Sequence, residues 1–140
     1  MSHNRRPEQD CILVIDDETN ALGLIRATLE EAGYVVFAAS NANEGVEFYQ
    51  NHWQEIKVVV LDFLMPEMTG DVVLQWLQLV NHDVKVLLLT AYGGEVVSRM
   101  RTLGVFGFLN KPFSLHDLVQ RVQDAVRTPT VVSSATPVSA

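Results

Sequence analysis

A run of four apolar residues, Val58 to Leu61, ends at a carboxylate, Asp62. A continuous run of β-branched and aliphatic residues is typical of a strand that is buried on both faces, as in a parallel sheet. Pro66 follows closely and prevents the strand from continuing far beyond Asp62. In open α/β sheets, ligands bind at the carboxyl ends of the strands. Asp62 is therefore either a helix cap or a residue of a binding site.

Three further apolar runs also end in polar residues: Cys11–Ile15 before Asp16 and Asp17, Val86–Leu89 before Thr90, and Phe106–Leu109 before Asn110 and Lys111. If the strands are parallel, their carboxyl ends meet at one edge of the sheet. The carboxylates gathered there would repel one another unless a divalent cation with oxygen ligands lies between them. A lysine beside them would hold an anion that the metal also touches. These are the parts of a phosphoryl-transfer site.

Helical spacing of apolar residues fills the gaps between the runs. The pattern predicts a helix over Thr19–Ala32, a short strand over Tyr34–Ala38, a helix capped by Asn41, one opening at Thr69-Gly70, one over Glu95–Leu103, and a last helix from the Ser114 cap to about Arg127. We expect core packing for the apolar stripes of these helices, which include Trp53, Trp76, Val80, Leu115 and Val126.

Short motifs follow the apolar runs in a fixed order: Asp16-Asp17, Asp62 with Met65-Pro66 and Gly70 behind it, Thr90-Ala91, and Lys111-Pro112-Phe113. Together they resemble the receiver domain of bacterial two-component response regulators, over about residues 10–127. The resemblance implies a flavodoxin-like α/β fold with a five-stranded, doubly wound parallel sheet in the strand order 2-1-3-4-5. We expect right-handed crossovers to alternate the helices between the two faces of this sheet.

The same resemblance implies a role for each residue of the acidic site. Asp62 would be the nucleophile that accepts a phosphoryl group from a sensor histidine kinase or a phosphotransfer protein. Asp17, Asp62 and the Leu64 carbonyl would bind Mg²⁺ directly, and Asp16 would act mainly through an intervening water. Lys111, the Thr90 hydroxyl and the Ala91 N–H would contact the phosphoryl oxygens. The chain would be a phosphorylation switch rather than an enzyme with a separate substrate.

Other residues would transmit and time the signal. Phe108 occupies the family's aromatic switch position and would move with Thr90, changing the surface of the fourth helix, fifth strand and fifth helix. The Lys111–Pro112 bond is expected to be cis. Leu64 and Tyr92 flank the approach of water to Asp62, so we expect these bulky side chains to prolong the life of the phosphoryl group.

Two other classes of protein fit parts of the pattern. A haloacid-dehalogenase-like phosphatase also uses an aspartyl nucleophile and Mg²⁺, but it needs an acid two residues after the nucleophile, where this chain has Leu64. A flavodoxin-like binding protein shares the fold, but the acidic Asp16-Asp17-Glu18 segment has the wrong charge to cradle a phosphate. A degenerate receiver lacks support, because no part of the site is missing.

Composition limits the partners. With 10 Lys and Arg against 17 Asp and Glu, the net charge of −7 disfavours nucleic-acid binding. No apolar run approaches the ~20 residues that cross a bilayer, and no signal segment is evident, so we expect a cytoplasmic protein without a membrane span. The single cysteine, Cys11, excludes an internal disulfide.

The predicted organisation is a disordered lead (1–10), a receiver domain (11–127) and a linker-like tail (128–140). Leu103–Phe108 lacks the acidic pair that is usual before the fifth strand in receivers of the winged-helix DNA-binding class. This favours a stand-alone receiver or one from another architecture, and the tail leaves truncation open. Homodimerisation on phosphorylation is also left open.

Overall fold

A computed structural model describes residues 10–129. The elements are β1 (Cys11–Ile15), α1 (Thr19–Glu31), β2 (Val35–Ala39), α2 (Ala42–His52), β3 (Ile56–Asp62), α3 (Gly70–Val80), β4 (Val86–Thr90), α4 (Glu95–Leu103), β5 (Gly107–Asn110) and α5 (Leu115–Arg127). The bounds differ from the predicted ones by a residue at α1, β2 and β5, and β3 begins two residues before the predicted apolar run and includes Asp62. The lead and tail lie outside the described residues, apart from Asp10, Thr128 and Pro129.

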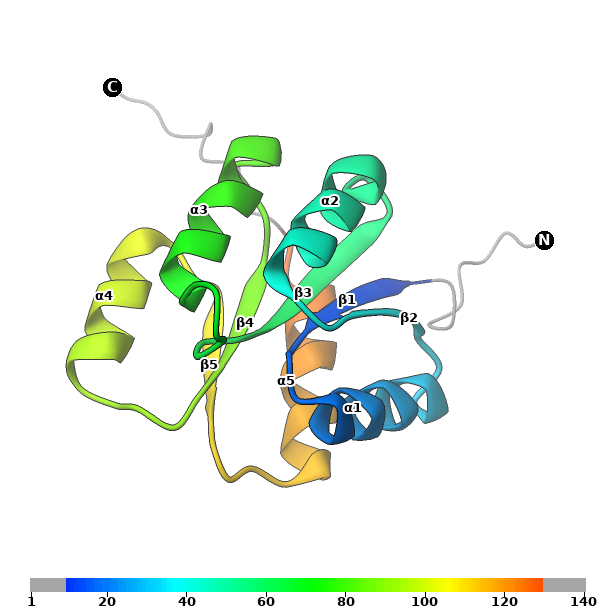
Figure 1. Cartoon of the computed structure of the whole chain (residues 1–140). Coiled ribbons are helices and arrows are strands. Elements are labelled where there is room, and N and C mark those ends of the chain that lie inside the picture. Colours follow the sequence, from blue (N-terminus) through cyan, green and yellow to red (C-terminus); the bar gives the residue numbers. More distant parts are fainter. Residues whose placement is uncertain (1–9, 130–140) are drawn as a thin grey trace.

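The strands form one five-stranded sheet with the order β2-β1-β3-β4-β5, and all neighbouring pairs are parallel. This confirms the predicted fold class. The two central strands, β1 and β3, pair directly, so that Ile15 lies opposite Leu61. The next residue on each strand is an aspartate, Asp16 or Asp62. The register alone therefore brings two carboxylates to the same edge of the sheet. Figure 1 shows β1 and β3 side by side in the middle of the sheet.

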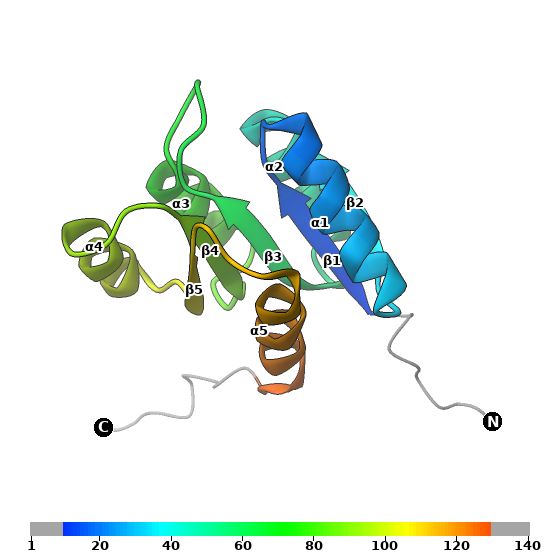
Figure 2. The ribbon, with the colours of Figure 1, turned by 90° about the horizontal axis from the view of Figure 1, so that it is seen from below.

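The helices form two layers over the sheet. α1 and α5 pack on one face, and α2, α3 and α4 pack on the other (Figures 1 and 2). The predicted strict alternation is therefore wrong. The chain crosses the sheet in one direction from β1 to β2 and in the opposite direction through β3, β4 and β5. Because each crossover is right-handed, the three helices of the second stretch share a face.

The core lies on both faces of the sheet, and Val58 to Asp62 is buried throughout, as predicted for a central parallel strand. For two residues, the prediction that they lie in the core is wrong. Trp76 is 38% exposed, because Leu74 and Leu77 already occupy the inward side of α3. Leu115 is 37% exposed at the first turn of α5. Cys11 is half-buried and packs against the core.

Side chains cap the helices where the sequence predicted. The Asn41 carboxamide accepts a hydrogen bond from the Glu44 N–H (2.8 Å), and the Ser114 hydroxyl accepts one from the Asp117 N–H (3.0 Å). The Glu44 carboxylate returns to the N–H of Ser40, one residue earlier than in a standard capping box. Within residues 10–129, none of the helices has the length and hydropathy of a membrane span.

Candidate functional site

Three aspartates meet at the carboxyl ends of β1 and β3. Asp16 and Asp17 directly follow β1, and Asp62 is the last residue of β3. Each side chain offers an oxygen, and these atoms all lie within 4.8 Å of one another. Asp16 is 1% exposed and Asp62 is 4% exposed, whereas Asp17 is partly open to solvent. The sequence prediction of a carboxylate cluster at the switch point of the sheet is therefore met by the geometry.

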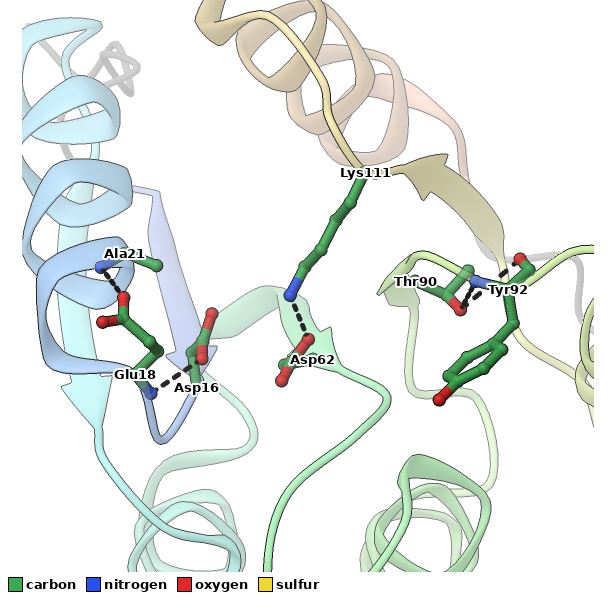
Figure 3. Close-up of polar contacts among 7 residues, drawn as sticks. All are labelled: Asp16, Glu18, Ala21, Asp62, Thr90, Tyr92 and Lys111. Carbon is green, nitrogen blue, oxygen red and sulfur yellow. Dashed lines mark hydrogen bonds and ion pairs between the residues drawn. The ribbon is translucent and has the colours of Figure 1, made fainter.

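Lys111 reaches into this cluster from the segment after β5. Its Nζ donates a hydrogen bond to Asp62 Oδ1 at 2.7 Å (Figure 3). The backbone of Lys111 is fixed at the end of β4, because its N–H donates a hydrogen bond to the Thr90 carbonyl at 2.9 Å. The Lys111–Pro112 peptide bond is cis, as expected. Lys111 follows β5 directly, and it contacts the end of β4 through its backbone and the end of β3 through its side chain.

Burial dominates the electrostatics of the cluster. It raises the pKa of Asp16, and the neighbouring Asp62 and Asp17 charges add to the rise, while the Glu18 N–H and the Lys111 charge oppose it. The pKa of Asp62 is also raised, again chiefly by burial, against the hydrogen bond and charge of Lys111. Both carboxylates therefore ionise at a free-energy cost that one lysine does not fully offset.

The donor set fits a hard divalent cation. Asp16 Oδ1 accepts a hydrogen bond from the Glu18 N–H at 3.0 Å. Asp16 Oδ2 is buried and has no hydrogen-bond partner among the described residues. A buried, unpaired carboxylate oxygen is costly unless a cation or an ordered water satisfies it. Oxygen ligands from clustered carboxylates suit Mg²⁺, so these residues could hold that ion.

The remaining predicted site residues surround a cavity of about 270 Å³. Its lining comprises Asp17, Glu18, Asp62, Phe63, Leu64, Thr90, Ala91, Tyr92 and Lys111. Thr90 is buried, and its Oγ1 accepts a hydrogen bond from the Tyr92 N–H at 2.9 Å. In Figure 3, Thr90 and Tyr92 lie on the β4 side of Asp62, opposite Asp16. The structure thus brings the acids, the hydroxyl and the ammonium group around one cavity.

Phe108 lies apart from that cavity. It pairs with Leu88 across β4 and β5, and its half-buried ring lies on the α4 side of the sheet. The Arg101 guanidinium carbon lies 5.3 Å from the centre of the ring, at cation–π distance. Arg121 donates a hydrogen bond to the Phe108 carbonyl. A link from Asp62 to Phe108 can pass through β4, where Leu88 pairs with Phe108, or through Lys111 at the end of β5.

Two residues of the cavity were absent from the predicted site. Glu18 supplies the N–H that holds Asp16, and its carboxylate caps α1 by accepting from the Ala21 N–H at 2.7 Å. Its place in an acidic run before a helix is a signal, although glutamate is not a favoured cap. Phe63 meets the Tyr92 ring edge-on, with the ring centres 6.0 Å apart. No local pattern in the sequence marks that contact.

The parallel α/β sheet places a ligand site at its switch point, and the acidic pocket there defines a class of protein that could bind a metal ion. Within that class, the model of the response regulator receiver domain matches residues 12–123. The chain is 38% identical over 117 residues to response regulator RR06 of Streptococcus pneumoniae, covering 83% of this chain and 52% of that protein.

Solved structures agree. A response regulator receiver domain from Clostridium thermocellum has a TM-score of 0.77 and 32% identity, over 83% of this chain and 93% of that one. CheY of Borrelia burgdorferi, in a complex with CheX, BeF₃ and Mg²⁺, has a TM-score of 0.78 and 26% identity, over 84% and 90% of the two chains. The chain belongs to the response regulator receiver domain family of two-component systems.

Family membership fixes the general function. Receiver domains are signalling switches rather than conventional enzymes; they generally bind Mg²⁺ at an acidic pocket and interact with histidine kinases and phosphotransfer proteins. The chain spans about half the length of most of the curated relatives it matches, and 12% of one sensor kinase. What those longer proteins do as a whole does not carry over to this chain.

Proposed function

We propose that Asp62 accepts a phosphoryl group from a phosphohistidine on a sensor histidine kinase or phosphotransfer protein. The observation that carries this proposal is the 2.7 Å contact between Lys111 Nζ and Asp62 Oδ1 inside a cluster of buried carboxylates. A lysine that pairs with the Asp62 carboxylate can pair with the phosphoryl oxygens once that carboxylate carries a phosphoryl group. The surrounding carboxylates supply the oxygen ligands for a metal.

In the proposed step, an Asp62 carboxylate oxygen attacks phosphorus. The P–O bond forms as the P–N bond to the imidazole breaks, and the imidazole leaves with the electron pair. Mg²⁺, held by Asp17, Asp62 and the Leu64 carbonyl, with Asp16 acting through water, would neutralise charge on the phosphoryl oxygens. Lys111 would pair with another of these oxygens. The protein's contribution is mostly positioning and charge neutralisation.

The switch would start at Thr90. Its hydroxyl oxygen accepts from the Tyr92 N–H at 2.9 Å, and the hydroxyl donates only a long hydrogen bond, 3.5 Å, to the Tyr92 carbonyl. A stronger acceptor can therefore take this hydrogen. We propose that the hydroxyl turns to a phosphoryl oxygen, with the Ala91 N–H as a second donor. Phe108 would then move into the space that Thr90 leaves, away from Arg101. The resulting change in the α4–β5–α5 surface would control an output partner or domain.

Acetyl phosphate tests the proposal without a kinase. We expect intact-mass measurement to show one added phosphoryl group in the presence of Mg²⁺, and none in chelator or in Asp62→Asn. Asp124→Asn, which removes an exposed carboxylate on α5, should be labelled like the parent. Labelling that survives Asp62→Asn would refute the assignment. Sustained turnover of p-nitrophenyl phosphate, instead of a single addition, would favour a phosphatase.

A further inference from the structure

Helix α3 has a second apolar face that the fold does not use. Its polar side chains are Asp71, Gln75 and Gln78, and two of these are already engaged: Asp71 pairs with Arg99, and Gln78 Nε2 donates to the Leu103 carbonyl at 2.7 Å. The rest of the helix, apart from Gly70, is apolar. A helix that is apolar nearly all round is normally buried all round. We therefore expect another molecule to cover the outward side of α3.

The side chains on that outward face are open to solvent. Leu79 is 86% exposed, more than any other large apolar side chain among residues 10–129, and Trp76 is 38% exposed. They lie three residues apart, which puts them on neighbouring turns of one helix face. By contrast, Val73, Leu74 and Leu77 on the sheet side are fully buried. A single exposed leucine is ordinary, whereas a leucine and a tryptophan together beside a groove mark an interaction site.

A groove of about 450 Å³ adjoins these two residues. Helix α2 contributes Val46, Glu47 and Gln50 to its lining, and α3 contributes Trp76, Leu79 and Val80. Figure 1 shows α2 and α3 side by side on one face of the sheet, with α1 and α5 on the other. A groove between two neighbouring helices, with apolar anchors on one rim, has the shape that accepts a further helix.

The negative charges around the groove favour a positively charged binding partner over a second copy of this chain. Among the described residues that line the groove, Glu47 alone is charged, and Glu44 lies exposed one turn earlier on α2. A second copy of this chain would bring the same carboxylates face to face, and the chain already carries a net charge of −7. Like charges placed opposite one another oppose association. A partner with positive charges beside an apolar stripe fits both features of the groove.

We propose that the α2–α3 groove binds an amphipathic helix of another protein, with its apolar stripe against Trp76 and Leu79 and a lysine or arginine facing Glu47. The residues that line this groove line neither the acidic cavity nor the pocket around Phe108. The groove can therefore be occupied whether or not Asp62 is phosphorylated. The groove would tether the receiver to a partner, while the α4–β5–α5 surface reports its state.

The test uses the full chain and two synthetic helical peptides. Both peptides carry leucines on one face, and the other face is lysine in one peptide and glutamate in the other. In an NMR titration, we expect the lysine peptide to shift the Trp76 indole N–H and the amides of α2 and α3. Leu79→Gln should weaken its binding about tenfold, because a buried leucine is worth roughly that much. Leu24→Gln on α1, where Leu24 is 54% exposed, is the matched control and should bind like the parent.

Glu47→Lys tests the charge: it should weaken binding of the lysine peptide and strengthen binding of the glutamate peptide. Equal losses in Leu79→Gln and Leu24→Gln would overturn the proposal. So would a failure of the lysine peptide to bind, or shifts confined to the α4–β5–α5 surface or the acidic cavity. A concentration-dependent dimer of the parent that Leu79→Gln abolishes would identify a second copy as the occupant instead. Leu79 is nearly fully exposed, so its substitution leaves the fold intact.

Discussion

Leu64 and Tyr92 stand at the mouth of the cavity that holds Asp62. They are 55% and 46% exposed, and both line the cavity. Neither carries a carboxylate or amide that could orient a water for attack on a phosphoryl group. We therefore predict that phospho-Asp62 persists for minutes rather than seconds in the purified protein with Mg²⁺, and that Leu64→Asn/Tyr92→Glu shortens this life.

The loss can be followed by intact mass after removal of acetyl phosphate. Leu24→Asn, a similar substitution at an exposed position of α1 outside the cavity, should leave the rate unchanged. If the parent loses its phosphate within seconds, or if the double variant loses it no faster than the parent, the two side chains do not exclude water.

At the scale of elements, α2 approaches β1 closely at Gly45. A Cβ placed on Gly45 would lie 2.5 Å from Ile15 Cδ1 and 2.7 Å from Ile15 Cγ1, and Ile15 is fully buried. We predict that Gly45→Ala destabilises the protein by about 1–3 kcal/mol, the usual cost of overpacking a core.

In α1, a Cβ on Gly23 would meet nothing within 4 Å. Gly23→Ala should therefore stabilise by about 0.5–1 kcal/mol through helix propensity. Urea unfolding measures both; equal signs would contradict the packing argument.

An ion pair joins α3 to α4. Arg99 Nη2 lies 2.6 Å from Asp71 Oδ2, and the Asp71 side chain is 8% exposed while that of Arg99 is 66% exposed. Burial acts to raise the pKa of Asp71, but the Thr69 hydroxyl, the Arg99 charge and two backbone N–H groups outweigh it, so the pKa is lowered. A lowered pKa means that the folded state holds its proton less tightly than the unfolded chain. Its contribution to stability is therefore present above the unfolded value near 3.8 and is lost as the pH falls through the folded pKa.

We predict that Arg99→Gln lowers the free energy of unfolding by about 1–2 kcal/mol at pH 7, between the values of exposed and buried pairs. The difference from the parent should shrink in acid, once Asp71 is protonated. Arg26→Gln removes an exposed pair with Glu30 on α1 and is the matched control, expected to cost at most about 0.5 kcal/mol. A difference between Arg99→Gln and the parent that is independent of pH would show that the ion pair is not its cause.

For the whole molecule, local sequence patterns were enough to predict the strands, whereas the strand order came from the resemblance to receiver domains. Each apolar run became a strand, and the aspartates that end β1 and β3 met because parallel neighbours in register must bring their ends together. The layers were less predictable, since the face on which a helix packs depends on the direction of the crossover. Trp76 was misplaced because helical spacing marks an apolar residue without saying whether the fold or a partner covers it. The Phe63–Tyr92 and Asp71–Arg99 contacts join residues far apart in sequence, where no periodicity reaches.

The carboxylate cluster links the stability of the whole domain to its metal. Because the raised pKa values of Asp16 and Asp62 mean that ionisation costs folding free energy, the metal-free protein is destabilised at neutral pH. We predict that Asp16→Asn raises the melting temperature in chelator, by about 4 °C for each kcal/mol relieved. Asparagine keeps the oxygen that accepts from the Glu18 N–H, so only the charge is removed. Asp124→Asn should melt like the parent.

Millimolar Mg²⁺ should stabilise the parent more than Asp16→Asn, because binding to the folded state alone shifts the equilibrium. An unchanged or lower melting temperature in Asp16→Asn, or a parent indifferent to Mg²⁺, would mean that repulsion within the cluster does not limit the stability of the domain.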